Sequence, residues 1–509
     1  MSDLRMAGRR EIDRRLPSPP WSRDRDAGGV PTLIVGAGAA ARTLTRDLRR
    51  SPDYGLRPVG ALDDDPRVRS VSGVPVLGTI ADLRRIVREH RIEAIVVAIP
   101  SLAPAALGAL VRQAADTGAH VRFLPSFLAA VERIARAADL RTVSFSTLLG
   151  RPERRRLQPA ARQSLAGARV LVTGAGGSIG QELCRQIRAC GPESLHMLDH
   201  DESNLHTLQL DLDGAALLDS PDVIIADIRD RIRIEQVLRA ARPDVVFHAA
   251  AHKHLPLLER HPCEGVKSNV LGTHNVVRAA VAAGVSRFVQ ISTDKAADPR
   301  SILGVTKRLG EIVVQTHAYG PTRVCSVRFG NVLGSRGSFL TSVAEQIARG
   351  EPVTVTDPDV TRFFMTVEEA VGLVLSAAPM AEYGETFVLD MGEPVRIVDL
   401  VRRYAEQAHI PDVQIRYTGL RPGEKLHEVL FSDAEERIPT AHPGIYATRP
   451  GRPPEDLEAR LGELYEAAAQ GQDARVRALL EDLVPEYHAT SATDGELALA
   501  AQSRYPDEF

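Results

Sequence analysis

Short apolar runs alternate along the chain with longer segments in which apolar positions recur every three or four residues. Such alternation predicts strands that are each followed by a helix, and therefore a parallel sheet with helices on both faces. The runs expected to form buried strands are rich in Val, Ile and Leu and span residues 32–35, 94–99, 170–172, 194–198, 222–228, 244–250 and 287–291. The pattern therefore predicts an α/β fold.

The run at residues 170–172 ends in a turn that contains Gly174, Gly177 and Gly180, and a helix-period segment follows it. Glycines allow the backbone to approach a pyrophosphate closely, and the N-terminus of the helix offers it unpaired N–H groups. Asp199 ends the next apolar run, where a carboxylate can bind an adenosine ribose hydroxyl. We therefore expect a dinucleotide here, with NAD favoured because a carboxylate repels a 2′-phosphate and NADP kept as the alternative.

The other residues expected at the dinucleotide follow the ends of neighbouring strands. Asp227 ends one strand and is a candidate for the adenine amino group, while the small residues at 249–251 leave room for the dinucleotide to cross another. The full set of expected cofactor contacts is Gly174, Gly177, Ser178, Ile179, Gly180, Asp199, Asp227, Ile228, Ala249, Ala250, Ala251, Ser292 and Lys307.

An earlier glycine turn, Gly36-Ala-Gly38, follows the strand predicted at residues 32–35. Helices are expected at residues 39–50, 81–90 and 104–117, so residues 30–130 are predicted to form a small Rossmann-like domain. Asp63 or Asp64 would serve a nucleotide there as ribose partner. An equally good alternative is a domain that has lost its ligand and serves for assembly.

The remaining segments differ in composition. Residues 1–29 mix Arg, Asp and Pro with few apolar positions, which predicts a flexible arm. Amphipathic helices are expected at 457–469 and 474–483. The predicted organisation is therefore an arm (1–29), a first domain (30–130), a linker (131–167), a second domain (168–450), C-terminal helices (451–488) and a tail (489–509).

Composition excludes several classes of protein. The 509 residues are 44% hydrophobic and 25% charged, as in a soluble globular protein of two or three domains. A net charge of −3 gives no global field for nucleic acid or a membrane surface. The four cysteines lack metal-ligand spacing and are expected to be buried free thiols, so no metal site is predicted. With no signal peptide and no transmembrane run, we expect a cytoplasmic location.

A polar cluster, Ser292-Thr-Asp-Lys295, follows the strand predicted at 287–291. Ligands of open α/β sheets bind beyond the carboxyl ends of strands, so this cluster is expected to point into the site. Leu303-Gly-Val-Thr-Lys307 then opens a helix.

Together with these segments, several motifs resemble those of extended short-chain dehydrogenases, and specifically the UDP-N-acetylglucosamine 4,6-dehydratases of polysaccharide biosynthesis. The motifs are Thr173-Gly-Ala-Gly-Gly-Ser-Ile-Gly180, His248-Ala-Ala-Ala-His-Lys-His254, Arg328-Phe-Gly-Asn-Val-Leu-Gly-Ser-Arg-Gly337, Thr361-Arg-Phe-Phe-Met365 and Arg421-Pro-Gly-Glu-Lys-Leu-His-Glu428. The resemblance covers residues 30–450. It implies a short-chain dehydrogenase domain with a small C-terminal substrate-binding part, preceded by a Rossmann-like domain.

The resemblance also implies catalytic roles for four residues. Bound NAD would take hydride from sugar C4 and return it to C6, while Lys295 removes the C5 proton and Asp294 protonates the departing C6 hydroxyl. Thr293 would bind the C4 oxygen and Lys307 the nicotinamide ribose. Asp294 would need a raised pKa and Lys295 a lowered one. Leu303 occupies the position of the usual tyrosine base, which leaves the acceptor of the C4 hydroxyl proton unassigned.

For the UDP-sugar, arginines suit a diphosphate because the guanidinium is planar and permanently charged. The expected substrate contacts are Lys253, Asn331, Arg362, Arg421 and Glu424, the last on the uridine ribose. A homo-oligomer is expected. The alternatives are a UDP-sugar 4-epimerase, which Leu303 disfavours, and a non-catalytic nucleotide-sugar sensor, which the intact Thr293-Asp294-Lys295 disfavours.

Overall fold

The structure is a computed structural model that describes residues 29–50, 56–99, 110, 119–123, 157–213, 216–333, 335, 339–349, 351–407, 413–449, 451 and 453–488. The chain divides into two compact units, residues 1–142 and 143–509, which are described separately. Almost all of the helix expected at 104–117, almost all of the expected arm and the whole of the expected tail lie outside the described residues.

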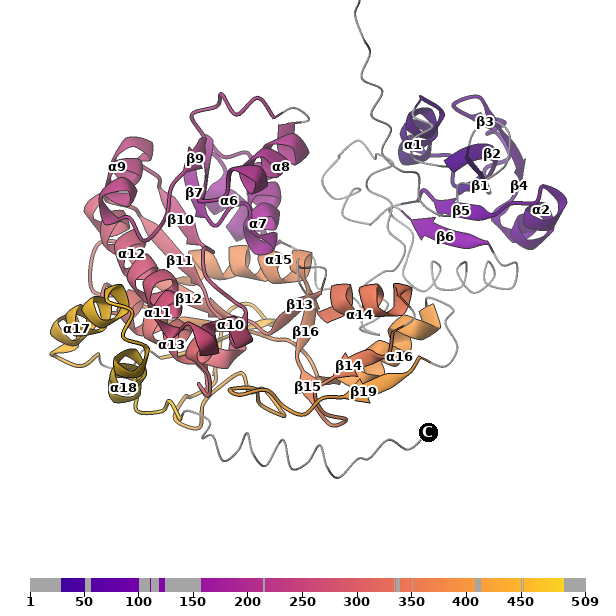
Figure 1. Cartoon of the computed structure of the whole chain (residues 1–509). Helices are drawn as coiled ribbons and strands as arrows, with labels where there is room; N and C mark the ends of the chain where they lie inside the picture. The colour runs from indigo at the N-terminus through magenta and orange to yellow at the C-terminus, as the bar shows by residue number, and fades with distance from the viewer. Residues whose placement is uncertain are drawn as a thin grey trace, which may run out of the picture. The chain divides into compact units, whose positions relative to one another are not determined.

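The first unit is built on a six-stranded sheet with the order β3-β4-β2-β1-β5-β6 (Figure 1). Its elements are β1 (Val30–Val35), α1 (Ala39–Arg50), β2 (Leu56–Leu62), β3 (Ser70–Val71), β4 (Val74–Gly78), α2 (Leu83–Glu89), β5 (Ala94–Val97) and β6 (His120–Phe123). Successive side chains of β1 enter different cores, because Ile34 packs with α1 whereas Leu33 and Val35 pack with α2. Helices thus cover both faces of a sheet in which only β3 runs antiparallel to its neighbour.

The glycine turn of this unit is held by a carboxylate. Gly36 has a φ of +100°, a conformation that favours glycine. Oδ2 of Asp63 accepts the N–H of Ala37 at 2.6 Å, and Oδ1 accepts the N–H of Asp65 at 2.8 Å. The turn is therefore fixed from within the unit.

The second unit contains a nine-stranded sheet with the order β20-β21-β17-β12-β11-β10-β7-β8-β9. The strands are β7 (Arg169–Thr173), β8 (Ser194–Asp199), β9 (Val223–Ile225), β10 (Val245–His248), β11 (Arg287–Ile291), β12 (Arg323–Arg328), β17 (Thr386–Leu389), β20 (Ile438–Pro439) and β21 (Ile445–Thr448). They are parallel from β9 to β17 and antiparallel at β21 and β20. Strand order reverses between β7 and β10, the position where open α/β sheets bind ligands.

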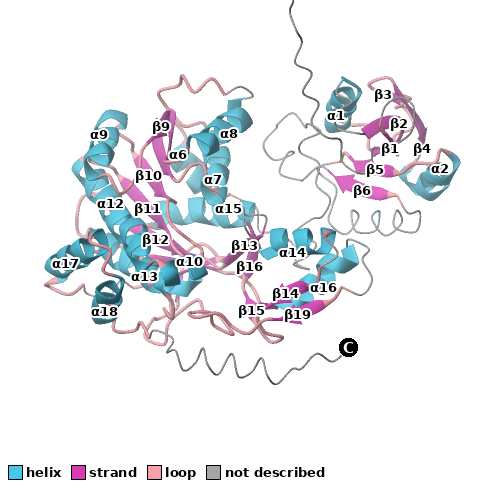
Figure 2. Cartoon of the chain, viewed as in Figure 1, coloured by secondary structure: helices cyan, strands magenta, loops and turns pink. Residues whose placement is uncertain are grey.

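Two apolar cores lie on the two faces of this sheet, and Figure 2 shows the helices that cover it. The helices of the second unit are α6 (Pro159–Leu165), α7 (Ser178–Arg188), α8 (Glu202–Asp213), α9 (Arg231–Ala241), α10 (Leu255–Arg260), α11 (Pro262–Gly265), α12 (Gly272–Ala282), α13 (Ile302–Gln315), α14 (Phe339–Ala348), α15 (Val367–Ala377), α16 (Ile397–Gln407), α17 (Leu457–Ala469) and α18 (Asp473–Leu483). The doubly wound α/β fold predicted from the sequence is confirmed.

Two helical regions at the ends of the second unit belong to its apolar cores. The expected linker was too long, because α6 lies within residues 131–167 and buries Ala161 and Leu165 in the second unit. At the other end, α17 and α18 bury Leu461, Leu464 and Leu480 in the core formed with α12 and α13. The C-terminal helices are thus an integral part of this unit.

A smaller apolar cluster forms beside the main sheet from α14, α16 and short strands. These strands pair as β13 (Asn331–Leu333) with β16 (Phe364–Thr366), β14 (Val353–Val355) with β19 (Ile415–Tyr417), and β15 (Thr361–Arg362) with β18 (Val395–Arg396). The segment after β19 bridges to β15 through Thr361 and His427, so it returns to the C-terminal end of the main sheet.

A buried ion cluster ties β12 to α13 and to the segment before β20. The Arg328 side chain is fully buried, and its nitrogens lie 2.6 Å from Glu311 Oε2 and 2.7 Å from Glu435 Oε2. Glu311 also accepts the hydroxyl of Ser292 at 2.6 Å. Removing the arginine would leave two carboxylates without their main buried partner, which is strongly destabilising.

We expect Arg328→Gln to reduce the free energy of unfolding by roughly 3–5 kcal/mol, the range for breaking a buried pair. Arg169→Gln is the matched control, because Arg169 pairs with Asp244 where both side chains are 37% exposed, and it should change stability little. Urea unfolding of the second unit, followed by circular dichroism, measures both. Equal losses of unfolding free energy in the two variants would show that burial does not set the cost of breaking these ion pairs.

Candidate active site

The backbone of the glycine turn after β7 packs directly against the backbone at the end of β10. A Cβ at position 174 would lie 2.6 Å from the nitrogen of Ala250, and one at position 180 would lie 2.0 Å from the oxygen of Gly174. No side chain fits at either position. The turn therefore presents bare backbone and the start of α7 to the adjoining space, which is the form that a pyrophosphate requires.

Two cavities adjoin this turn and share Gly174, Gly177, Ala249, Ala251 and His252. The first has a volume of about 200 Å³ beyond β8, β9 and β10, and the second a volume of about 540 Å³ beyond β10 and β11, both partly open to solvent. They form one continuous groove across the switch point of the sheet. All of the expected cofactor contacts line it: Gly174, Gly177, Asp199, Asp227, Ile228, Ala249, Ala250 and Ala251 in the first cavity, and Ser178, Ile179, Gly180, Ser292 and Lys307 in the second.

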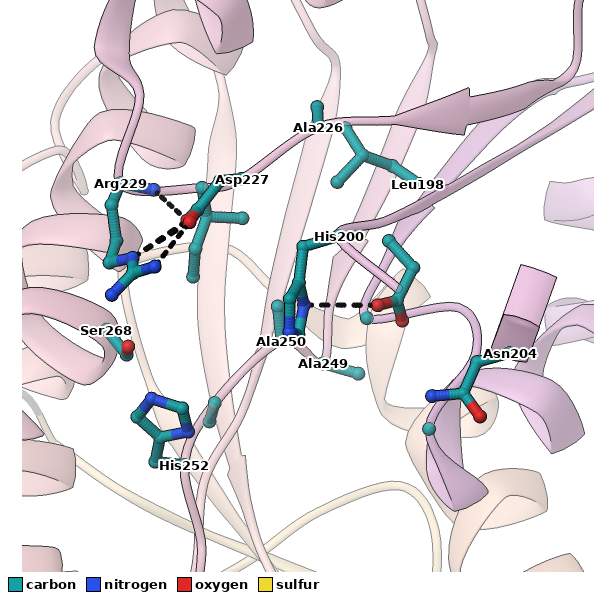
Figure 3. A pocket seen from close by; sticks show the side chains of 15 residues that line it. Leu198, His200, Asn204, Ala226, Asp227, Arg229, Ala249, Ala250, His252 and Ser268 are labelled. Carbon is teal, nitrogen blue, oxygen red and sulfur yellow. Dashed lines mark hydrogen bonds and ion pairs between the residues drawn. The ribbon is translucent and has the colours of Figure 1, made fainter. Parts of the chain in front are cut away.

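Asp199 lies in the first cavity with both carboxylate oxygens engaged. Oδ2 accepts the N–H of Gly176 at 2.9 Å, and Oδ1 accepts the N–H of Asp201 at 3.0 Å. The His200 ring lies 3.2 Å from Oδ1 (Figure 3). Asp199 thus orders the glycine turn and places a negative charge in this cavity.

Asp227 forms an ion pair with Arg229, whose guanidinium lies 2.6 Å from Oδ2 (Figure 3). Arg229 also lies 3.2 Å from Glu264, so paired charges border this side of the cavity. His252 lines both cavities, and its backbone is fixed by the side chain of the buried Asn269.

The second cavity brings together Thr293, Lys295, Leu303 and Lys307. Leu303 lies in its wall with 6% of its surface exposed, so an apolar side chain faces the space where the resemblance expects a phenol. Lys253 and Asn331 line the same cavity.

Asp294 is fully buried and lies outside the cavity lining, beneath Thr293 and Lys295. Its Oδ1 is 3.0 Å from Lys295 Nζ and accepts the hydroxyl of Thr293 at 3.0 Å. Oδ2 has no hydrogen-bond partner among the described residues. Burial raises the pKa of Asp294, against the opposing charge of Lys295.

Lys295 differs from the sequence expectation. Burial disfavours its charged form, but the carboxylates of Asp294 and Glu428 outweigh burial, and the pKa of Lys295 is raised. The lowered pKa expected from the sequence was wrong. Nζ also lies 3.4 Å from Asn331 Oδ1. The expectation failed because a second carboxylate, Glu428, reaches the lysine from a distant part of the chain.

Lys307 donates from Nζ to the carbonyl of Ile291 at 2.5 Å, which fixes its side chain at the end of β11. Burial lowers the pKa of Lys307 to about 8, against the opposing charge of Glu311.

Three expected substrate contacts lie outside the lining of the second cavity. Arg362 NH2 is 2.8 Å from Glu424 Oε1, and its NH1 donates to the carbonyls of Thr361 and Leu426. The backbone N–H of Arg421 donates to Glu424 Oε2 at 3.2 Å, and the Arg421 side chain is exposed. These residues form a cluster of their own, in which Glu424 holds Arg362.

Sequence reasoning assigned no role to Glu428, His252, Asn204 or Arg229. Asn204 and Arg229 line the first cavity, as His252 does. The signal for His252 and Glu428 was present, because both lie within quoted motifs. Arg229 and Asn204 follow strands at the ligand-binding edge, but strand ends alone carry many polar residues that bind nothing.

Among the described residues, no helix is both long and apolar enough to cross a membrane.

The comparisons with known proteins identify a class and then a family. The profile of the "Polysaccharide biosynthesis protein" family matches residues 170–450, and that of a "CoA-binding domain" matches residues 20–125. The chain is 39% identical over 425 residues to "Capsular polysaccharide biosynthesis protein CapD" of Staphylococcus aureus, which covers 82% of this chain and 71% of that protein. A solved structure, "Pen from Bacillus thuringiensis", is 32% identical with a TM-score of 0.52, covering 56% of this chain and 89% of that one.

Two groups of relatives differ in their activity. A "UDP-N-acetylglucosamine 4,6-dehydratase (inverting)" of Campylobacter jejuni is 31% identical over 56% of this chain and 83% of its own length. A "UDP-glucose 4-epimerase" of Rickettsia rickettsii is 31% identical over 52% of this chain and 78% of its own length. The second unit is thus an extended short-chain dehydrogenase of the nucleotide-sugar-modifying class. The chain belongs to the polysaccharide biosynthesis protein family, as the resemblance predicted.

Lys307 gives a test of this geometry that needs no ligand. Its pKa of about 8 in the folded protein lies below the ordinary 10.5, so the folded state binds fewer protons than the unfolded state between these values. The unfolding free energy of the wild type, relative to Lys307→Met, should therefore rise with pH across this window, by up to about 3 kcal/mol. Urea unfolding at several pH values measures the difference.

Lys267→Met is the control, since Lys267 is 28% exposed and pairs with Glu264. Replacing this partly exposed lysine should cost at most about 1 kcal/mol. Parallel curves for wild type and Lys307→Met would contradict the burial of the Lys307 amine.

Proposed function

We propose that the protein is an NAD(P)-dependent UDP-N-acetylglucosamine 4,6-dehydratase, a lyase that makes a UDP-4-keto-6-deoxy-N-acetylhexosamine for polysaccharide or glycan biosynthesis. The observation that carries the proposal is the second cavity. Thr293, Lys295 and Lys307 line the same space as the glycine turn, while Leu303 stands where an epimerase or dehydrogenase needs a tyrosine. The dehydratase relative of Campylobacter jejuni supports the same reaction.

The groove suits a dinucleotide, because its turn excludes side chains at Gly174 and Gly180 and the start of α7 offers N–H groups. When bound, the nicotinamide supplies reversible hydride exchange with the sugar. Asp199 and Asp227 would hold the adenosine, and the negative charge of Asp199 favours NAD over NADP. Lys307 would bind the nicotinamide ribose.

Lys295 and Asp294 would carry the proton transfers of the elimination. Asp294, with its raised pKa, is suited to donate the proton that leaves with the C6 hydroxyl as water. Lys295 would take the C5 proton, for which it must first lose the proton that the charges of Asp294 and Glu428 favour. Because Asp294 lies beneath the cavity wall, its proton reaches O6 after a side-chain shift or through water. Thr293 would bind the C4 oxygen.

The substrate would enter the second cavity beside Lys253 and Asn331. Arg362, Arg421 and Glu424 would receive the diphosphate and uridine ribose. In this assignment Arg362 exchanges its contact with Glu424 for a phosphate oxygen, which conserves a charge-assisted hydrogen bond.

Mass spectrometry of a reaction with UDP-N-acetylglucosamine and NAD tests the proposal. Loss of one water supports the dehydratase. An unchanged mass with inverted C4 supports the epimerase activity named in the Rickettsia relative, and no turnover supports a sensor.

We expect Lys295→Ala to lower dehydration by ~10³-fold or more, within the range for removing an acid–base group, while NAD binding stays near normal. Isothermal titration with NAD and mass spectrometry of the product measure the two effects. Equal loss of binding and turnover would rule out the proposed catalytic role.

We expect Gly180→Ala to weaken NAD binding at least ~10-fold, since its methyl group would displace the turn that receives the pyrophosphate. Gly462→Ala is the control, because a Cβ there meets nothing within 4 Å and Ala favours a helix. Wild-type affinity in Gly180→Ala would place the dinucleotide elsewhere.

A further inference from the structure

A third carboxyl group borders the polar cluster after β11. Oε1 of Glu428 lies 3.6 Å from Lys295 Nζ, and the Glu428 side chain is 3% exposed. It arrives on the segment after β19, which the bridge between Thr361 and His427 attaches to β15. Lys295 is thus held between two carboxyl groups that come from distant parts of the sequence.

The remaining contacts of Glu428 are also charged. Oε2 lies 3.1 Å from Lys425 Nζ, and Oε1 lies 3.9 Å from Arg362 Nε. Lys425 in turn donates to the carbonyl of Asp298 at 2.7 Å and lies 3.5 Å from its carboxylate. Arg362 is held by Glu424. Glu428 therefore connects Lys295 with the arginine proposed for the diphosphate.

The charges of this network are compensated unevenly. Four carboxyl groups (Asp294, Asp298, Glu424, Glu428) meet four cations (Lys295, Arg300, Arg362, Lys425), of which Arg300 pairs with Asp298 at the more exposed edge. Glu428 contacts three of these cations, whereas Lys295 is the only cation in contact with Asp294 among the described residues, and Asp294 shares it with Glu428. A poorly compensated charge in a buried site is costly, and a carboxyl group avoids that cost by keeping its proton.

Asp294 is therefore the carboxyl group whose charge is least compensated. It is fully buried, and its Oδ2 has no hydrogen-bond partner among the described residues. Burial raises the pKa of Asp294, and the charge of Glu428 raises it further. For Glu428, burial acts in the same direction, but Lys295, Lys425 and Arg362 outweigh it and lower its pKa. The pKa values of the two carboxyl groups are thus shifted in opposite directions, which favours protonation at Asp294 and disfavours it at Glu428.

We propose that Glu428 is a positioning residue of the dehydration, which holds the Lys295 side chain and whose negative charge keeps Asp294 in its proton-donating form. The reaction half of this inference rests on the proposed function. Glu428 itself lies outside the lining of the second cavity, so it acts through Lys295 and Asp294.

The expected effect of removing this charge has a definite sign. Without it, the protonated forms of both Asp294 and Lys295 are less favoured, so both groups titrate at lower pH. The reaction needs neutral Lys295, which sets the acid limb of the pH profile, and protonated Asp294, which sets the alkaline limb. Both limbs should therefore shift to lower pH, each by about one unit. On the alkaline side of the optimum kcat would fall ~10-fold.

The test is the pH profile of kcat and KM for Glu428→Gln with UDP-N-acetylglucosamine and NAD. Both limbs should move to lower pH by about one unit, with KM changed less than ~3-fold. Glu424→Gln is the matched control on the same segment, since it releases Arg362 without touching Lys295, and it should change KM but not the limbs. If the limbs of the pH profile do not move in Glu428→Gln, whether or not KM rises, Glu428 has only a structural role and the proposal is overturned.

Two further measurements test the effect of the Glu428 charge. Glu428→Asp keeps the charge but shortens its reach, so its limbs should lie between those of wild type and Glu428→Gln; this variant decides the question if the glutamine variant does not fold. Infrared spectroscopy reads Asp294 without turnover. A protonated-carboxyl band that is absent in Asp294→Asn should weaken in Glu428→Gln at neutral pH, and an unchanged band refutes the charge role even if the wild type proves not to be a dehydratase.

Discussion

The groove depends on one close approach, that of the backbone after β7 to the end of β10. At Gly174 there is no room for a methyl group, because the nitrogen of Ala250 would lie 2.6 Å from it. This contact joins the two cavities at the switch point of the sheet, where helix N-termini and strand ends converge. The polar groups that follow β8, β10 and β11 then face one continuous space.

The architecture was readable from the sequence because buried parallel strands leave a strong apolar signal. The runs before Gly174, Asp199 and His248 all became strands of the central sheet. What escaped was the contribution of α6, since a short helix in a region rich in Arg and Pro carries no such signal. The membership of α17 and α18 in the core was equally hidden, because an amphipathic pattern states which face is apolar but not what covers it.

The site was predictable where it follows strand ends in order along the chain. Thr293, Lys295 and Lys307 needed only the strand at residues 287–291 and the helix after it. The charge state of Lys295 was not predictable, because it depends on Glu428, which the fold brings from more than a hundred residues away to 3.6 Å. For the same reason nothing in the sequence indicated that Arg362, expected at the diphosphate, forms an ion pair with Glu424. A local sequence pattern predicts where a residue lies in an element, whereas the ion-pair partners of that residue depend on the tertiary fold.

The two glycine turns of the chain share one construction. Asp63 accepts backbone N–H groups from Ala37 and Asp65, as Asp199 does from Gly176 and Asp201. Each turn is thus held by backbone hydrogen bonds to a carboxylate of its own unit. A loop that is ordered in this way loses little conformational freedom when it receives a ligand, so more of the energy of the new contacts appears as affinity.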